Sequence, residues 1–151
     1  MKKLLVIMLI FTGFYQWSIG ESNSVAPVAT PVNQAKTASY LDNDKIQNAY
    51  KNRLSNIQIK GEGTVIKILP DDNKGSRHQK FILRLSSGQT LLIAHNIDLA
   101  PRINSISNGD NVQFYGEYEW NNKGGVIHWT HYDPNGRHIG GWLKHRGKTY
   151  Q

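Results

Sequence analysis

The sequence predicts a mainly β protein, a small five-stranded barrel preceded by one N-terminal helix. From Gln58 onward, apolar and polar residues alternate with a period of two, the pattern of strands that bury one face. Turn-forming stretches rich in Gly, Asn and Asp separate these runs. The 151 residues are 38% hydrophobic and 10% aromatic, which is enough for one core and excludes a wholly disordered chain.

The first 20 residues have the composition of a secretory signal peptide. Lys2 and Lys3 precede a short apolar run, and the small residues Ser18 and Gly20 stand just before the expected cleavage point. A membrane anchor is the alternative, but it needs about 20 apolar residues, and this run is shorter. We therefore expect an exported protein of the bacterial periplasm or exterior, with residues 1–20 as signal peptide and no membrane-spanning segment after cleavage.

Residues 21–39 predict a flexible linker, because they are rich in Ser, Ala, Asn, Thr and Pro and lack hydrophobic periodicity. The folded domain, an OB-like barrel, is expected over residues 40–151. It begins with a helix at about residues 42–55 that would cover one end of the β core. The apolar side chains of this helix form one stripe: Ile46, Ala49, Tyr50 and Leu54.

Five runs of alternating residues are expected as strands. They span residues 58–69, 80–85, 90–95, 111–120 and 126–133. Gly61 and Gly63 predict a bulge or bend in the long first strand. A weakly helical stretch at 96–107 separates the third strand from the fourth. This order favours a closed barrel of the OB type over an open antiparallel sheet with one helix packed on it.

Several segments of the chain are distinctive: HQKF at 78–81, HNIDLAPR at 95–102, GEYEWN at 116–121 and HWTH at 128–131. Together they resemble a family of exported bacterial proteins, domain-of-unknown-function family 3465, which is known for an HWTH motif. The resemblance covers roughly residues 57–150. It implies an exported small β domain and nothing catalytic, so the function has to be argued from the residues.

The second hairpin brings candidate catalytic residues to one face. A two-residue turn at 123–124 would set Glu119 opposite His128 on a polar outer face, with Trp129 pointing to the core. Glu119, His128 and His95 are candidates for the general base or the metal ligands of a phosphodiesterase. The spacing of these residues is not diagnostic of any enzyme.

Three histidines near the C-terminus, His128, His131 and His138, are candidate ligands for a divalent metal. His128 and His131 have HxxH spacing, which aligns two imidazoles on a helix but sends them to opposite sides of a strand. A shared metal therefore requires a bulge or a turn near Thr130. The alternative is structural, with His131 packed beside Trp129. No cofactor is predicted, and a divalent metal is retained only as a candidate.

The first hairpin predicts a basic strip. A turn at 87–88 would place Lys80 beside His95 on the outer face. The strip would consist of His78, Lys80, Arg84 and His95, with Arg77 and Arg102 nearby. Such a strip, with aromatic rings near it, suits the phosphates and bases of nucleic acid. The alternative is a solvated basic surface, with Asp98 as a loop cap. The candidate binding residues are His78, Lys80, Arg84, His95, Asp98, Arg102, Trp120, Tyr132 and Trp142.

Three functions follow from these features. The first is a secreted module that binds an anionic or sugar-rich polymer, above all extracellular nucleic acid, because the formal charge of +7 is still +5 once Lys2 and Lys3 are removed. The second is a small metal-assisted phosphodiesterase or nuclease, and the third is a structural or protein-interaction domain. The absence of cysteine, of a GxSxG elbow and of a phosphate loop excludes disulfides, thiolate zinc sites and several enzyme classes. No pattern predicts an oligomeric state.

Overall fold

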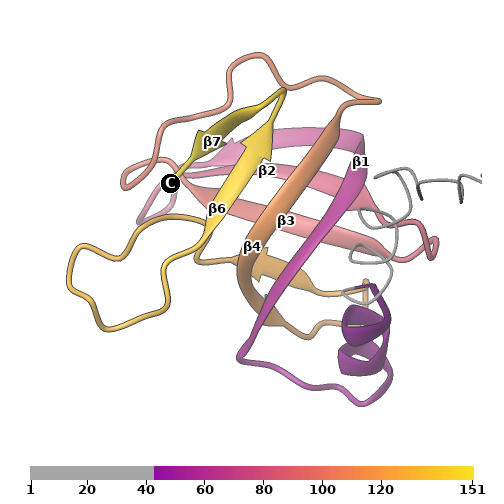
Figure 1. Ribbon diagram of the computed structural model, residues 1–151. Helices are drawn as coiled ribbons and strands as arrows, with labels where there is room; N and C mark the ends of the chain where they lie inside the picture. The colour runs from indigo at the N-terminus through magenta and orange to yellow at the C-terminus, as the bar shows by residue number, and fades with distance from the viewer. Residues whose placement is uncertain (1–42) are drawn as a thin grey trace, which may run out of the picture.

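The computed structural model describes residues 43–151, so the predicted signal peptide, the predicted linker and residues 40–42 lie outside the described residues. The described chain begins with a helix over residues 43–51, which is shorter than predicted. Ile46 and Ala49 are buried on its inner stripe, whereas Leu54, beyond its end, is 42% exposed. The helix covers one end of the β structure, as expected (Figure 1). Within residues 43–151, no helix has the length and apolar character needed to cross a membrane.

Seven strands form one sheet. They are β1 (Ile57–Asp72), β2 (His78–Arg84), β3 (Thr90–Asn96), β4 (Asn111–Glu119), β5 (Val126–His128), β6 (Trp142–His145) and β7 (Lys148–Tyr150). Pairing runs in the order β1-β2-β3-β5-β4, and β4 also pairs with β1, so these five strands close into a ring. They correspond to the five predicted strands. The prediction missed β6 and β7, which extend the sheet beyond β4.

The ring closes because β1, with 16 residues, is long enough for two partners. Its first half, up to Thr64, pairs antiparallel with β4, and the half that begins at Thr64 pairs antiparallel with β2. Figure 1 shows β1 as one long strand that crosses the molecule. The register against β2 shifts between Val65 and Lys67 and again between Leu69 and Asp72. A single bent strand therefore belongs to two sides of the ring.

The predicted bulge does not lie at Gly61 or Gly63. These glycines instead allow close packing, because a Cβ on Gly61 would come within 2.7 Å of the Phe114 ring. A Cβ on Gly63 would lie 2.9 Å from the carbonyl oxygen of Arg84. The two glycines thus permit β1 to approach its neighbours, while the irregular pairing follows later in the strand.

The core fills the ring and continues beneath β6 and β7, since alternate side chains of each strand point inward. Its largest strand residues are Ile59, Phe81, Leu83, Leu91, Ile93, Phe114, Tyr118, Ile127 and Leu143. Residues 97–110, between β3 and β4, contain turns in place of the predicted weak helix. This connection still places Ile103 and Ile106 in the core.

The β2–β3 hairpin is shifted by one residue from the predicted register. Lys80 pairs with Ala94, and Gln79 pairs with His95. The strands are joined by a three-residue loop at 86–88, in which the last residue is a glycine with a φ of 84°, rather than by a two-residue turn. Because side chains alternate along a strand, this single step turns His95 from the outer face to the core.

The β4–β5 hairpin is shifted by two residues, so that Glu117 rather than Glu119 lies opposite His128. Its loop spans residues 120–125 and ends in two glycines with positive φ. A shift of two preserves the faces, and both glutamates still share the outer face with His128. β5 ends at His128, earlier than predicted, because Trp129 adopts a φ of 52° and the chain leaves the sheet there.

Candidate functional site

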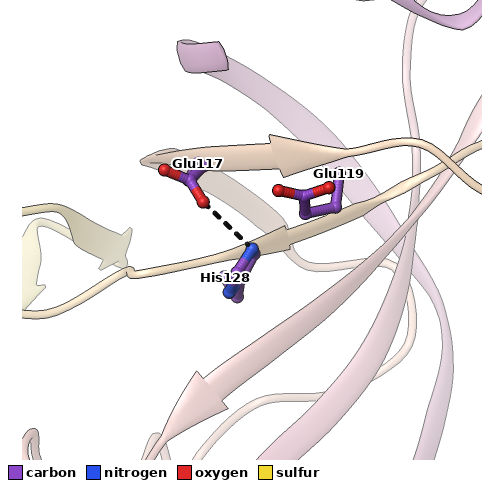
Figure 2. Close-up of side chains that lie close together, drawn as sticks. All are labelled: Glu117, Glu119 and His128. Atoms are coloured by element: carbon purple, nitrogen blue, oxygen red, sulfur yellow. Dashed lines mark ion pairs between the residues drawn. The ribbon is translucent and has the colours of Figure 1, made fainter. Parts of the chain in front are cut away.

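Two glutamates and one histidine meet on the outer face where β4 pairs with β5. Glu117 and Glu119 project from the same side of β4 because alternate strand residues share a face, and His128 lies on β5 opposite Glu117. Ligand atoms of the three side chains lie within 4.8 Å of one another. Figure 2 shows the two carboxylates on one strand and the imidazole on its neighbour. These three residues are the Glu/His cluster.

The surroundings of His128 favour the neutral form of its imidazole. Burial lowers its pKa, and the charges of Glu117 and Glu119 oppose this only in part. Its Nε2 atom is buried without a hydrogen bond and lies 3.5 Å from Oε1 of Glu117. A neutral imidazole with an unbonded nitrogen is the form that ligates metal ions.

A second histidine, His138, reaches the cluster from the long β5–β6 connection at residues 129–141. Its Nε2 donates a hydrogen bond to Oε2 of Glu117 at 2.5 Å, and its Nδ1 donates to the carbonyl oxygen of Ile139 at 2.8 Å. Burial alone would lower the pKa of His138, but these two hydrogen bonds and the Glu117 charge together raise it. This shift favours the protonated ring, whose hydrogen bond to Glu117 is charge-assisted.

Asp133 fixes the conformation of the β5–β6 connection. Its buried carboxylate accepts hydrogen bonds from the backbone N–H groups of Asn135, Arg137 and His138. These hydrogen bonds hold the pKa of Asp133 below its usual range. The indole of Trp129 stacks on the His138 ring, with centroids 4.0 Å apart and planes 7° from parallel. A carboxylate and an indole thus position His138 beside the cluster without strand pairing.

An open hollow of about 410 Å³ adjoins the Glu/His cluster and is here named the outer hollow. Glu119 and His128 form part of its wall, and Lys80 brings a positive charge to it. The ammonium group of Lys80 lies 3.5 Å from the carboxylate of Asp72. The residues that line the outer hollow are Asp72, His78, Lys80, Leu92, Ala94, Glu119, Val126 and His128.

Acidic neighbours pair with Lys80 of the predicted basic strip and with the two arginines near it. Arg102 pairs with Asp71, with Nε 3.0 Å from the carboxylate. Asp98 pairs with Arg77 at 2.7 Å and also accepts a hydrogen bond from its backbone N–H, which agrees with the loop-cap interpretation of Asp98. Arg84 is exposed near the far end of β2 and borders a different hollow. Only His78 and Lys80 of the predicted strip line the outer hollow.

His95 lies inside the protein and not on the outer face. It is fully buried, with Nδ1 2.8 Å from the hydroxyl oxygen of Thr130 and Nε2 3.2 Å from the carbonyl oxygen of Pro101. Burial lowers the pKa of His95 to about 4. This placement is incompatible with contact to a bound polymer or with general-base catalysis on one, since the ring does not reach solvent.

The three aromatic candidates lie in different places. Trp120 packs against the core, and its indole N–H donates to the carbonyl oxygen of Tyr50 at 3.1 Å. Trp142 lies beside Tyr115, with ring centroids 6.2 Å apart. Tyr132, in the β5–β6 connection, is 67% exposed. None of the three lines the outer hollow, so they do not form one stacking platform there.

His131 does not join the Glu/His cluster. It is buried, its Nδ1 donates to the carbonyl oxygen of Tyr132 at 2.8 Å, and its ring centroid lies 5.2 Å from that of Trp129. The structural alternative for His131 is confirmed. Among the described residues, the group of close ligand atoms includes His128 but neither His131 nor His138. Trp129 itself is half-buried and not part of the core, contrary to prediction.

The model of a protein family of unknown function, DUF3465, matches residues 28–151, a span that includes every residue of the site. The chain belongs to family DUF3465. The resemblance seen in the sequence is thereby confirmed. No curated protein matches the chain. The function of this DUF3465 protein therefore has to be argued from its site.

Glu117 is the member of the DUF3465 site that the candidate residues lacked. A signal for it exists in the sequence, because two carboxylates spaced two apart on a strand, as in Glu117-Tyr118-Glu119, share one face. Asp133 was missed as well, and its role depends on a loop conformation that no periodic pattern encodes. His138 was a candidate, but its contact with Glu117 follows from that same loop.

Proposed function

We propose that the strand ring of this DUF3465 protein is an OB-like barrel whose outer hollow binds an anionic polymer, with extracellular nucleic acid as the favoured ligand. The observation that carries the proposal is the location of the hollow. OB folds bind oligonucleotides and oligosaccharides on the face of strands 2 and 3, between the loop joining strands 1 and 2 and the loop joining strands 4 and 5. Asp72 and His78 flank the first of these loops, Glu119 and Val126 flank the second, and all four line the hollow.

The strand order supports the same architecture. The ring runs β1-β2-β3-β5-β4 and returns to β1. Only β3 and β5 pair in parallel, and the other four pairs of the ring are antiparallel. The pairing of β1 with β4 distinguishes this ring from the open antiparallel sheet that was the alternative.

The chemistry of the outer hollow suits a phosphodiester chain. Lys80 and His78 provide donors for phosphate oxygens, and Leu92, Ala94 and Val126 provide apolar surface for a base or a sugar. The positive charge of the chain favours phosphate through the release of counterions. The carboxylate of Asp72 competes with phosphate for the ammonium group of Lys80. We therefore expect a dissociation constant in the micromolar range at physiological salt.

The test is a titration of the mature chain with a single-stranded oligonucleotide in the presence of EDTA, followed by tryptophan fluorescence at low and at physiological salt. We expect saturable binding that weakens as salt rises. Lys80→Glu should weaken it by about tenfold and reduce the salt dependence, because it reverses a charge in the hollow. Arg84→Glu, on the same strand but outside the hollow, should have a smaller effect.

Lys144→Glu is the matched control, since it makes the same charge change on β6 at an exposed position away from the hollow. Equal losses for Lys80→Glu and Lys144→Glu would show that net charge alone drives binding. No binding at either salt concentration would remove nucleic acid as the ligand.

A second candidate function is metal-assisted phosphodiester hydrolysis. The observation that favours it is that Glu119 and His128, a carboxylate and a neutral imidazole, line the same hollow as Lys80. We expect cleavage of the oligonucleotide only when a divalent metal is supplied, and loss of cleavage in His128→Gln at unchanged circular dichroism. Intact oligonucleotide after incubation with Zn²⁺, Mn²⁺ and Mg²⁺ would contradict it.

A further inference from the structure

We infer that Glu117, Glu119 and His128 form a binding site for one divalent transition-metal ion, with Zn²⁺ as its best representative, and that His138 positions Glu117 for it. The inference is independent of polymer binding, because a metal site needs no polymer to be occupied. Among residues 43–151, these three side chains form a group of potential ligands whose ligand atoms lie within 4.8 Å of one another.

The spacing of two of the ligand atoms already fits a metal ion. Zn²⁺ binds imidazole nitrogen and carboxylate oxygen at about 2.0–2.2 Å, so two ligands of a tetrahedral site lie about 3.4 Å apart. Nε2 of His128 and Oε1 of Glu117 are separated by 3.5 Å. Glu119, on the same face of the same strand, places a carboxylate oxygen within 4.8 Å of ligand atoms of both side chains and completes the set.

A buried nitrogen without a hydrogen bond points to the same conclusion. Nε2 of His128 is buried and makes no hydrogen bond, and such buried polar atoms are uncommon in proteins. Within residues 43–151, the recorded ion-pair partners of Glu117 are His128 and His138, and no lysine or arginine forms an ion pair with Glu117 or Glu119. Two neighbouring carboxylates repel each other, and a dication between them and the imidazole would offset this repulsion and bind the nitrogen that lacks a hydrogen bond.

His138 supplies the support that metal-binding carboxylates usually have. It donates to Oε2 of Glu117, while Oε1 of the same carboxylate faces His128. One oxygen is therefore held and the other is directed toward the proposed ion. Hydrogen bonds that hold a metal-binding carboxylate in this way typically contribute about 10–100-fold to metal affinity. His138 is a positioning residue in this arrangement, and Asp133 and Trp129 hold it in turn.

The donor set indicates the class of ion. Two carboxylates and one imidazole suit Zn²⁺, Mn²⁺ or Co²⁺, whereas Mg²⁺ and Ca²⁺ prefer sites made of oxygen alone. Three protein ligands leave a coordination position open, and Glu119 and His128 border the outer hollow. The open position would therefore face the hollow and accept water or an anion.

The experiment titrates the metal-free mature chain with Zn²⁺ against a chromophoric indicator at pH 7.5, without nucleic acid. We expect one tight site, with Mg²⁺ bound far more weakly. Glu119→Gln should lower the zinc affinity by at least about tenfold, whereas Glu62→Gln, a glutamate of β1 outside the cluster, should leave it unchanged. Circular dichroism and the melting temperature of the metal-free variants check that each one is folded.

Two further readouts separate this site from adventitious binding to histidine. The imidazole nitrogen signals of His128 should shift on addition of Zn²⁺ while those of buried His95 do not. His138→Ala should weaken zinc binding by about tenfold, and His138→Gln should restore much of it, because an amide can still donate to Glu117. An unchanged affinity in Glu119→Gln, or an unshifted His128, would overturn the inference. Neither result bears on the oligonucleotide titration, which is carried out in EDTA.

Discussion

At the residue scale, His95 shows how burial determines the state of a titratable group. Thr130 and Pro101 provide partners for its two ring nitrogens, so the neutral ring is accommodated in the core. The charged ring would lose its hydration, and His131 nearby offers no compensating negative charge. The pKa of His95 is therefore about 4 in the folded protein, against about 6.5 for an ordinary histidine.

This shift predicts a loss of stability in mild acid. Between pH 6.5 and 4, the unfolded chain binds a proton at His95 that the folded protein does not, so the free energy of unfolding falls as the pH falls. The contribution of His95 is complete above pH 6.5 and should decline by about 3 kcal/mol between pH 7 and pH 4. Urea unfolding across this pH range measures it.

The variant His95→Gln provides the reference for this measurement, since glutamine does not titrate. Its stability at pH 7 should be lower than that of the wild type, but its decline between pH 7 and pH 4 should be smaller by the same amount. Parallel pH profiles for the two proteins would contradict the assignment of the acid sensitivity to His95.

At the scale of strands and hairpins, the sequence predicts well which residues form strands. It predicts less well which residues are paired across two neighbouring strands. The alternation of apolar and polar residues located all five ring strands, because it directly reflects one buried face. Register depends instead on the loops. Gly88 in a left-handed conformation lengthens the first loop by one residue, and in the second the side chain of Asn121 accepts hydrogen bonds from Lys123 and Gly125.

These two errors had different consequences for the site. The one-residue shift moved His95 to the core and removed it from the predicted basic strip. The two-residue shift exchanged the partners on β4 and β5 but kept Glu119 and His128 on one face, so the predicted cluster survived with Glu117 added. His138 was a predicted candidate, but its contact with Glu117 could not be predicted, because residues 129–141 have no periodic pattern.

Gly116 on β4 is the element-scale test of how β5 is held. A Cβ at this position would lie 2.5 Å from the carbonyl oxygen of His128 and 2.9 Å from the Thr130 methyl group. Gly116→Ala should therefore push β5 away from β4 and lower the free energy of unfolding by about 1–3 kcal/mol. Chemical denaturation measures the loss, and the NMR signals of His128 report the displacement.

Gly140→Ala is the matched control, because a Cβ there would meet no atom closer than 3.7 Å. It should change stability by less than about 0.5 kcal/mol. Similar losses for the two variants would mean that close packing at Gly116 does not hold the two strands together.

At the scale of the whole molecule, net charge and local charge differ. The excess of basic residues is plain in the sequence, and the expected register of the first hairpin placed several of them in one basic strip. The ion pairs of Arg77, Lys80 and Arg102 with aspartates arise only when β1, β2 and the β3–β4 connection come together. Composition therefore predicts a preference for anions but not the surface on which an anion would bind.

The two unpredicted strands share the core of the ring, and this too can be measured. Leu143 of β6 is fully buried and pairs with Phe114 of β4. Leu143→Ala should lower the free energy of unfolding by about 2–5 kcal/mol, since it leaves a cavity in the common core. The exposed neighbour Lys144→Ala should have little effect. Unfolding monitored by tryptophan fluorescence distinguishes the two, and a small loss for Leu143→Ala would make β6 a peripheral addition.

The parallel pairing of β3 with β5 has a consequence for how the ring opens. It consists of the pairs Leu92↔Val126 and Ile93↔Ile127, whereas β1 and β4 are joined from Ile57↔Tyr118 to Thr64↔Asn111. A closed circle of strands parts first at its shortest seam, where the fewest hydrogen bonds have to break. The outer hollow lies across this seam, with lining residues on both β3 and β5. Any ligand seated there would bridge the seam, so occupancy of the hollow and closure of the ring would stabilise each other.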